Sequence, residues 1–216
     1  MKIIDSLNET KQMIDALLEN KSLTFASNSI PKPLDETRNA AQACYFALQR
    51  GNKIIFMGNG GSAAEAQHLA AELVGHFIQD RKPYAAIALT TDTSAITAIG
   101  NDYSFKEIFS RQLLAIANRG DVAIYFSTSG SSENILEAMK IGKTMGLVNI
   151  AFTGMKTSWM KEYAHYYIAI PSTKTPQIQE GHLMLGHILC DYIEEKMVRL
   201  ENEIQTKDLP NVWYGS

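Results

Sequence analysis

One stretch of the chain combines residue types that could bind an anion with residue types that could move a proton. A glycine turn leads directly into a helix, in the run Gly58-Asn59-Gly60-Gly61-Ser62-Ala63-Ala64-Glu65-Ala66-Gln67-His68-Leu69-Ala70-Ala71-Glu72. Glycines let the backbone approach a ligand closely, and the free N–H groups at a helix start favour an anion. His68 and Glu72 are one turn apart, so they lie on one face and could share a metal ion or a substrate. The stretch therefore indicates an enzyme that acts on a phosphorylated small molecule.

Two other interpretations of the glycine turn stay open. It could be a tight strand-to-helix turn without a ligand, with Ser62 as the N-cap of the helix. The spacing of Gly58, Gly60 and Ala63 also matches a loose dinucleotide-binding fingerprint. That fingerprint needs an acidic residue about 20 positions further on. Asp92 lies 34 positions after Gly58, so the match is weak.

The helix after the turn carries Glu65, His68, Glu72 and His76 within roughly an 80° arc. Most of its other residues are apolar, so this stripe could be the solvent-exposed face of an amphipathic helix. Two histidines without a lysine or arginine are unusual on such a face. The alternative is a stripe that lines a pocket. Glu65 also has capping-box spacing from Ser62.

A second candidate anion loop follows the apolar run 121–126. It reads Ser127-Thr128-Ser129-Gly130-Ser131-Ser132-Glu133-Asn134 and enters another helix. Hydroxyls together with free backbone N–H groups suit a phosphate monoester without lysine or arginine. A serine-rich N-cap region without a ligand is the alternative. Because both loops follow the carboxyl ends of expected parallel strands, they can converge on one crevice.

The last expected helix begins near Gln179 and carries His182 and His187. By composition alone, both histidines are ordinary helix residues. His187 lies eight residues after Gln179, about 12 Å along an ideal helix. One ion could not easily be held by both residues on one straight helix. Either Gln179 lies at or before the helix start, or the site draws on more than one subunit.

Alternating strands and helices from Lys53 onward must position these side chains. Apolar strand candidates are 53–57, 84–89, 121–127, 148–153 and 166–170. Helix candidates are 62–77, 94–99, 104–118, 132–145, 156–163 and 178–204. Short apolar strands separated by helices predict an α/β fold with a five-stranded parallel sheet flanked by helices.

Two helices precede this alternating core, which spans about 53–204. Apolar spacing predicts one helix in 2–27 and a second in 34–50, separated by the breaker 27–33. These two helices form an N-terminal extension of about 2–50. Their surplus amphipathic surface, and that of the long C-terminal helix, suggests packing against another subunit. The tail 208–216 has no assigned role.

The composition sets limits on the class of protein. The chain has 216 residues, 45% of them hydrophobic, which fits one domain with a sizeable core. A net charge of -3 gives no electrostatic case for nucleic acid or an anionic membrane as the main partner. The sequence shows no signal peptide and no apolar run long enough for a transmembrane helix. Cys44 and Cys190 are expected to be buried, reduced thiols of a cytosolic protein.

Over nearly its whole length the chain resembles the phosphoheptose isomerases, also called sedoheptulose 7-phosphate isomerases, of the sugar-isomerase (SIS) fold. The resemblance rests on several motifs in order: Gly58-Asn59-Gly60-Gly61-Ser62-Ala63-Ala64, Gln67-His68, Ala71-Glu72-Leu73, Thr91-Asp92-Thr93-Ser94, Gly100-Asn101-Asp102, Phe109-Ser110-Arg111-Gln112, Ser127-Thr128-Ser129-Gly130 and Gln179-Glu180 with His187. It implies a single SIS domain over 1–216. It also implies a cytoplasmic homotetramer with active sites between subunits.

The resemblance further implies the conversion of sedoheptulose 7-phosphate to D-glycero-D-manno-heptose 7-phosphate, the first step toward heptose for lipopolysaccharide or capsule. Glu72 is then the catalytic base and His187 the partner acid/base. One zinc ion per subunit is implied in zinc-binding members, with the ligands His68, Glu72, Gln179 and His187. The implied substrate contacts are Asn59, Gly60, Gly61, Glu72, Asn101, Asp102, Ser127, Thr128, Ser129, Ser132 and Gln179.

These residue types suit ketose–aldose exchange, which needs a base, an acid for the oxygens and stabilisation of an enediolate. One position departs from the family: members often carry arginine where this chain has His76. If that arginine holds substrate, His76 gives weaker, pH-dependent binding; if it is structural, little changes. We expect activity to survive. The alternative function is a non-enzymatic SIS relative that binds a regulator of replication initiation or senses a sugar phosphate.

Overall fold

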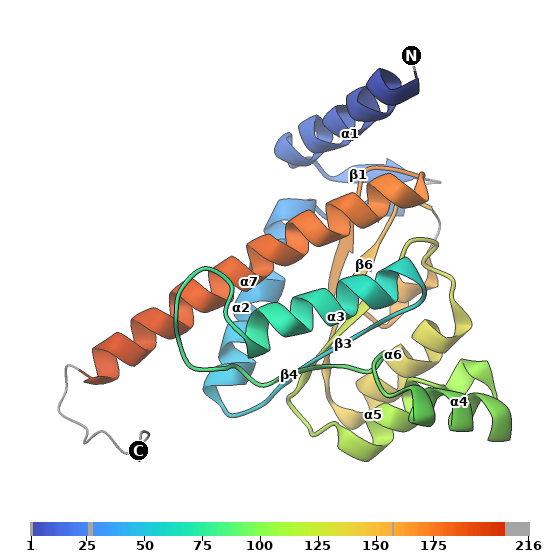
Figure 1. The fold of residues 1–216 in the computed structure, drawn as a ribbon. Coiled ribbons are helices and arrows are strands. Elements are labelled where there is room, and N and C mark those ends of the chain that lie inside the picture. Colours follow the sequence, from blue (N-terminus) through green and yellow to red (C-terminus); the bar gives the residue numbers. More distant parts are fainter. Residues whose placement is uncertain (1, 26–27, 157, 206–216) are drawn as a thin grey trace.

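The computed structural model describes residues 2–25, 28–156 and 158–205. Its centre is a five-stranded, all-parallel sheet in the order β4-β3-β5-β6-β7, as the sequence predicted (Figure 1). The strands are β3 (Ile54–Gly58), β4 (Ala86–Ala88), β5 (Val122–Ser127), β6 (Val148–Thr153) and β7 (Tyr166–Ala169). Each strand overlaps one of the predicted ranges. Only β4 is much shorter than expected, covering three of the six predicted residues.

Helices cover both faces of this sheet (Figure 1). One face packs against α2 (Pro33–Gln49), α3 (Gly61–Val74) and α7 (Thr175–Gln205). The other packs against α4 (Thr93–Asp102), α5 (Ser110–Ile116) and α6 (Glu133–Met145). Alternate residues of β3 serve the two layers, so that every residue of this strand is buried. The apolar run thus reflects a sheet covered on both sides.

The direction of chain winding reverses beside β3. From β3 the chain moves outward to β4, then returns to place β5 on the other side of β3. Open α/β sheets bind ligands outside the carboxyl ends of the strands at such a reversal. The glycine turn follows β3 and the serine loop follows β5. The fold therefore places both candidate anion loops at the expected ligand crevice.

The two predicted N-terminal helices exist, but the first is shorter than expected. Helix α1 (Lys2–Leu18) ends just before Asn20, whose backbone is left-handed with φ 44°. The chain then forms β1 (Leu23–Phe25), which pairs antiparallel with β2 (Asn28–Ile30). The prediction of helix up to residue 27 and of a plain breaker after it was therefore wrong. Residues 26–27 themselves lie outside the described part of the chain.

Three further predicted helices differ from the structure. The helix expected at 104–118 is a 3-10 turn, Phe105–Glu107, followed by α5. The helix expected at 156–163 is only a 3-10 turn, Trp159–Glu162. The helix expected at 62–77 ends at Val74 as α3, because the next backbone groups bond to side chains described below. The long C-terminal helix is confirmed as α7, and the tail 208–216 lies outside the described residues.

Both cysteines, Cys44 and Cys190, are free and buried, as the sequence predicted. Burial raises the pKa of each thiol, so neither is a reactive thiolate at neutral pH. Among the described residues, no helix is both long enough and apolar enough to cross a membrane.

Candidate active site

The glycine turn between β3 and α3 is shaped by its glycines and by a side chain from α7. Gly60 is the N-cap of α3 and has φ 56°, a backbone conformation that favours glycine. A Cβ atom at Gly61 would collide with the side-chain amide of Gln179. The predicted Ser62 N-cap and its capping box were wrong, because Ser62 is buried within the helix. Gln179 therefore lies directly against the turn that was predicted to hold an anion.

Gln179 belongs to α7, which begins at Thr175. The first alternative from the sequence, that Gln179 lies at or before the helix start, was therefore wrong. His187 follows two turns later on the same helix, so the two residues are separated by about 12 Å along the axis. Gln179 is placed to face the glycine turn, and His187 to face the middle of α3.

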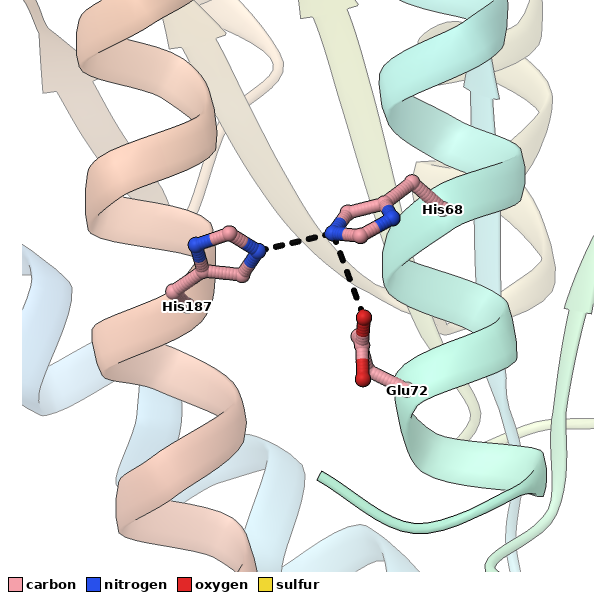
Figure 2. Close-up of side chains that lie close together, drawn as sticks. All are labelled: His68, Glu72 and His187. Atoms are coloured by element: carbon pink, nitrogen blue, oxygen red, sulfur yellow. Dashed lines mark hydrogen bonds and ion pairs between the residues drawn. The ribbon is translucent and has the colours of Figure 1, made fainter. Parts of the chain in front are cut away.

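Three of the four predicted metal ligands come together in the structure. His68 and Glu72 project from α3, and His187 projects toward them from α7 (Figure 2). His68 Nε2 lies 2.7 Å from His187 Nε2 and 3.2 Å from Glu72 Oε1. One ligand atom from each residue can be chosen so that all lie within 4.8 Å of one another. Two imidazole nitrogens and a carboxylate oxygen are a typical zinc donor set, with room for a further ligand.

The surroundings of His187 favour its neutral form. Burial lowers the pKa of His187 below its ordinary value of 6.5, and His68 lowers it further. The Glu72 carboxylate opposes this shift but does not cancel it. The Phe77 ring stacks on the imidazole, with centroids 5.4 Å apart and planes 29° apart. At neutral pH, His187 can therefore accept a proton or offer a lone pair to a metal ion.

The serine loop gathers its hydroxyls at the start of α6. The hydroxyl of Ser127 lies 3.4 Å from that of Ser129 and 3.1 Å from that of Ser132, the N-cap of α6. The N–H of Gly130 also donates to Ser127 Oγ. Thr128, half-buried, completes the run. Hydroxyls clustered at a helix N-terminus are suited to an oxyanion such as a phosphate.

The two loops are joined by a pair of amides. Asn59 Nδ2 donates to Asn134 Oδ1 at 2.9 Å, and Asn134 Nδ2 donates back to Asn59 Oδ1 at 2.8 Å. Asn134 is buried, and its oxygen also accepts the N–H of Ile135. The predicted convergence of the loops is therefore confirmed. Sequence reasoning gave Asn134 no role, because nothing in the linear run reveals its distant partner.

The remaining predicted residues are more scattered. The stripe on the glycine-turn helix divides, because Glu65 is buried beside His182 and His76 is exposed beyond the end of α3. Asn101 and Asp102 end α4 and are exposed, with the Asn101 amide donating to the Asp102 carboxylate at 2.8 Å. The structure thus assembles the acid/base cluster between α3 and α7 and joins the two loops to each other.

Comparison with known proteins agrees with this arrangement. The family model that matches, over residues 21–154, is the SIS domain. The phosphoheptose isomerase of Burkholderia pseudomallei (strain K96243) is 45% identical over 193 residues, which cover 83% of this chain and 98% of that protein. That of Aquifex aeolicus (strain VF5) is 54% identical over 149 residues, or 69% of this chain and 78% of that protein. This chain belongs to the phosphoheptose isomerase family.

Solved structures agree. A phosphoheptose isomerase from Neisseria gonorrhoeae superposes with a TM-score of 0.78 at 36% identity, covering 90% of this chain and 97% of that chain. A phosphoheptose isomerase from Francisella tularensis superposes with a TM-score of 0.77 at 35% identity, covering 90% of this chain and 100% of that chain. The predicted fold, family and enzyme class, a sugar-phosphate isomerase, are confirmed, and the non-enzymatic alternative is not favoured.

Proposed function

We propose that this enzyme converts sedoheptulose 7-phosphate to D-glycero-D-manno-heptose 7-phosphate through an enediol, as the first step of heptose biosynthesis for lipopolysaccharide or capsule. The observation that carries the proposal is the cluster of His68 and Glu72, on the helix that starts at the glycine turn, with His187 of α7. We propose that these proton-transfer groups act on a sugar phosphate held by the two loops. The relatives named phosphoheptose isomerase supply the reaction class.

In this proposal the serine loop holds the phosphate through Ser127, Thr128, Ser129 and Ser132. The hydroxyls of the loop and the N–H groups at the start of α6 supply the donors. The sugar extends past the glycine turn toward α7. Its proposed further contacts are Asn59, Gly60, Gly61, Asn101, Asp102 and Gln179. This orientation directs the carbonyl end of the ketose toward Glu72.

Glu72 then acts as the base. Its carboxylate removes a proton from the hydroxyl-bearing carbon next to the ketose carbonyl, and returns it to the former carbonyl carbon to give the aldose. His187 passes a proton between the two oxygens, since its lowered pKa keeps it neutral and able to accept one. The net result is isomerisation with no proton gained or lost.

Zinc fits the donor set of His68, Glu72 and His187, and we propose one ion per subunit held there. When bound, zinc supplies a Lewis acid that polarises the substrate carbonyl. Gln179 was the fourth predicted ligand, but two helical turns separate it from His187 on α7. We propose that Gln179 completes the site from a neighbouring subunit.

A homotetramer with active sites between subunits is consistent with two exposed apolar surfaces. Ile3, Ile4 and Leu7 on α1 are 78%, 64% and 67% exposed. Ile188, which directly follows His187, is half-exposed as well. Such apolar residues favour burial against another copy. We further propose that residues 1–216 act as a single SIS domain with its core at about 53–204, and that the free thiols belong to a cytoplasmic enzyme.

The decisive experiment incubates the purified protein with sedoheptulose 7-phosphate and follows formation of the aldose by NMR. Conversion is expected, and we expect it to survive the exchange of the family's usual arginine for His76, whose side chain is exposed. Absence of conversion, both with and without added zinc, would overturn the proposal. Metal analysis of untreated protein and a mass measurement in solution test the zinc ion and the tetramer.

A further inference from the structure

The end of α3 is built around a buried arginine from the loop that follows it. The last carbonyls of a helix lack partners within the helix. The Arg81 guanidinium donates from Nη2 to the carbonyl of Glu72 at 2.9 Å, and from Nη1 to those of Leu73 and Gly75 at 2.9 and 3.0 Å. Its positive charge also lies where the helix dipole favours a cation. Arg81 therefore fixes the helical turn that carries Glu72.

A glutamate from α7 holds the same loop from the other side. Glu194 accepts the backbone N–H groups of Phe77, Ile78 and Gln79 at 2.9, 2.8 and 3.0 Å. It also accepts Arg81 Nε at 3.0 Å. The two side chains are only 2% and 1% exposed, so this is a fully satisfied buried ion pair. The loop after α3 is thereby tied to α7.

Phe77, whose backbone N–H donates to Glu194, contacts the proposed acid/base His187 directly. Phe77 stacks on the imidazole of His187, and His68 meets the same imidazole edge-on with centroids 5.0 Å apart. Glu194 follows His187 by seven residues, two turns along α7, and so lies on the same side of that helix. His187 is thus held between a ring positioned by Glu194 and a ring positioned by α3.

We propose that Arg81, Glu194 and Phe77 form a positioning clamp that holds His187 and Glu72 in reach of each other. Arg81 fixes the backbone of Glu72, and Glu194 fixes the Phe77 ring that limits the rotation of His187. None of the three is proposed to touch the substrate. The clamp rests on the acid/base role proposed above for His187 and Glu72, and a small displacement of such groups costs much rate.

The test compares Phe77→Leu and Glu194→Gln with the wild-type enzyme. Phe77→Leu keeps an apolar side chain in the half-buried position but removes the flat ring, so the fold should survive. We expect kcat to fall about tenfold with KM unchanged. The imidazole NMR resonances of His187, assigned by comparison with His187→Gln, should move as the ring contact is lost. Glu194→Gln should likewise lower kcat and move the imidazole resonances of His187 in the same direction.

Asp121→Asn is the matched control, because Asp121 is also a buried carboxylate that accepts backbone N–H groups and a cation, but its donors lie just before β3 and β5 and not in α3, α7 or the loop after α3. It should lower stability and leave kcat unchanged. A folded Phe77→Leu enzyme with unchanged kcat and unchanged His187 resonances would overturn the clamp. Inactive wild-type protein would instead overturn the proposed function, and the resonances alone would then decide whether the clamp orients His187.

Discussion

The starts of two parallel strands and the candidate active site use polar side chains in different ways. At the amino edge, Asp121 precedes β5 and lies beside Lys53, which precedes β3. Asp121 Oδ1 accepts the Lys53 N–H and the Asn52 amide, and Oδ2 accepts Lys53 Nζ and the Asn118 N–H. These four donors come from backbone and neighbouring side chains that the fold already fixes. This carboxylate is committed to holding two strand starts together.

In the candidate active site, by contrast, the polar groups bond mainly to one another. His68 meets His187, and the Ser127 hydroxyl meets those of Ser129 and Ser132. Such contacts between like groups are easily exchanged for contacts with a ligand, because each group keeps spare donor or acceptor capacity. The difference teaches that hydrogen-bond partners, and not burial alone, separate structural polar groups from functional ones in this protein.

The largest effect should come from the carboxylate of Glu72 in the candidate active site. Glu72→Gln removes the proposed base while keeping the size of the side chain. Turnover of sedoheptulose 7-phosphate should fall by about 10²- to 10⁴-fold, the usual contribution of a positioned acid/base group. Steady-state kinetics by NMR measure this, with circular dichroism and thermal unfolding as checks of the fold. Substantial residual activity would remove the role assigned to Glu72.

Substitution of Asp121 should show the opposite pattern, with a loss of stability and no change in kcat. Asp121→Asn leaves the partly exposed Lys53 ammonium without its ion partner and turns two acceptor contacts unfavourable. We expect a loss of about 2 kcal/mol in the free energy of unfolding, somewhat below the cost of breaking a fully buried pair. Urea unfolding measures it. A change in kcat larger than the change in folded fraction would contradict a purely structural role of Asp121.

A smaller effect is expected within the serine loop. Ser129→Ala removes a hydroxyl proposed to contact the phosphate, and hydrogen bonds to charged groups contribute about 1.5–3 kcal/mol. KM should therefore rise about tenfold with little change in kcat. Ser131→Ala is the matched control, because the exposed Ser131 hydroxyl donates, among the described residues, to Ser129 alone. Equal effects of the two substitutions would argue against a specific phosphate contact at Ser129.

The smallest effect is the pH dependence of stability near neutral pH that comes from the buried carboxylates of Asp121 and Glu194. Burial alone raises the pKa of Asp121 and Glu194, but their hydrogen-bond donors and cations outweigh it, so each pKa lies below its ordinary value of 3.8 or 4.5. A lowered folded-state pKa adds stability above the unfolded value, and this stability is lost as the pH falls through the folded value.

The melting temperature should therefore change little between about pH 7 and 5 on account of these two groups, and fall below about pH 4. Thermal unfolding across this range measures it. The melting temperature of Asp121→Asn should fall less steeply in acid than that of the wild type, because one titrating group is gone. Parallel curves would show that other groups control acid unfolding.

Much of the fold could be predicted because local patterns reflect it. The buried strands are short apolar runs, and helices between them fix a parallel sheet. The end of α3 at Val74 could not be predicted, because Glu194 lies more than one hundred residues away along the chain. The hairpin of β1 and β2 was missed because the apolar spacing of α1 was extended past Asn20.

The site divides in the same way. The His68–Glu72 pair follows from helical spacing alone, and both loops follow from their place after strands. His187 received its acid/base role only from the family resemblance, since a lone histidine on a helix has no local signal. Asn134 and Phe77 had no assigned role, because their partners, Asn59 and His187, are set by the packing of distant elements.

The paired amides of Asn59 and Asn134 satisfy each other before any substrate arrives. The two loops are therefore already assembled, so that the phosphate proposed to bind there would cost little ordering entropy. A common anchor of this kind does not discriminate among sugar phosphates that share the same terminal group. In the proposed reaction, selection by chain length then depends on the distance from the proposed phosphate site to Glu72, which would act as a ruler for the ketose.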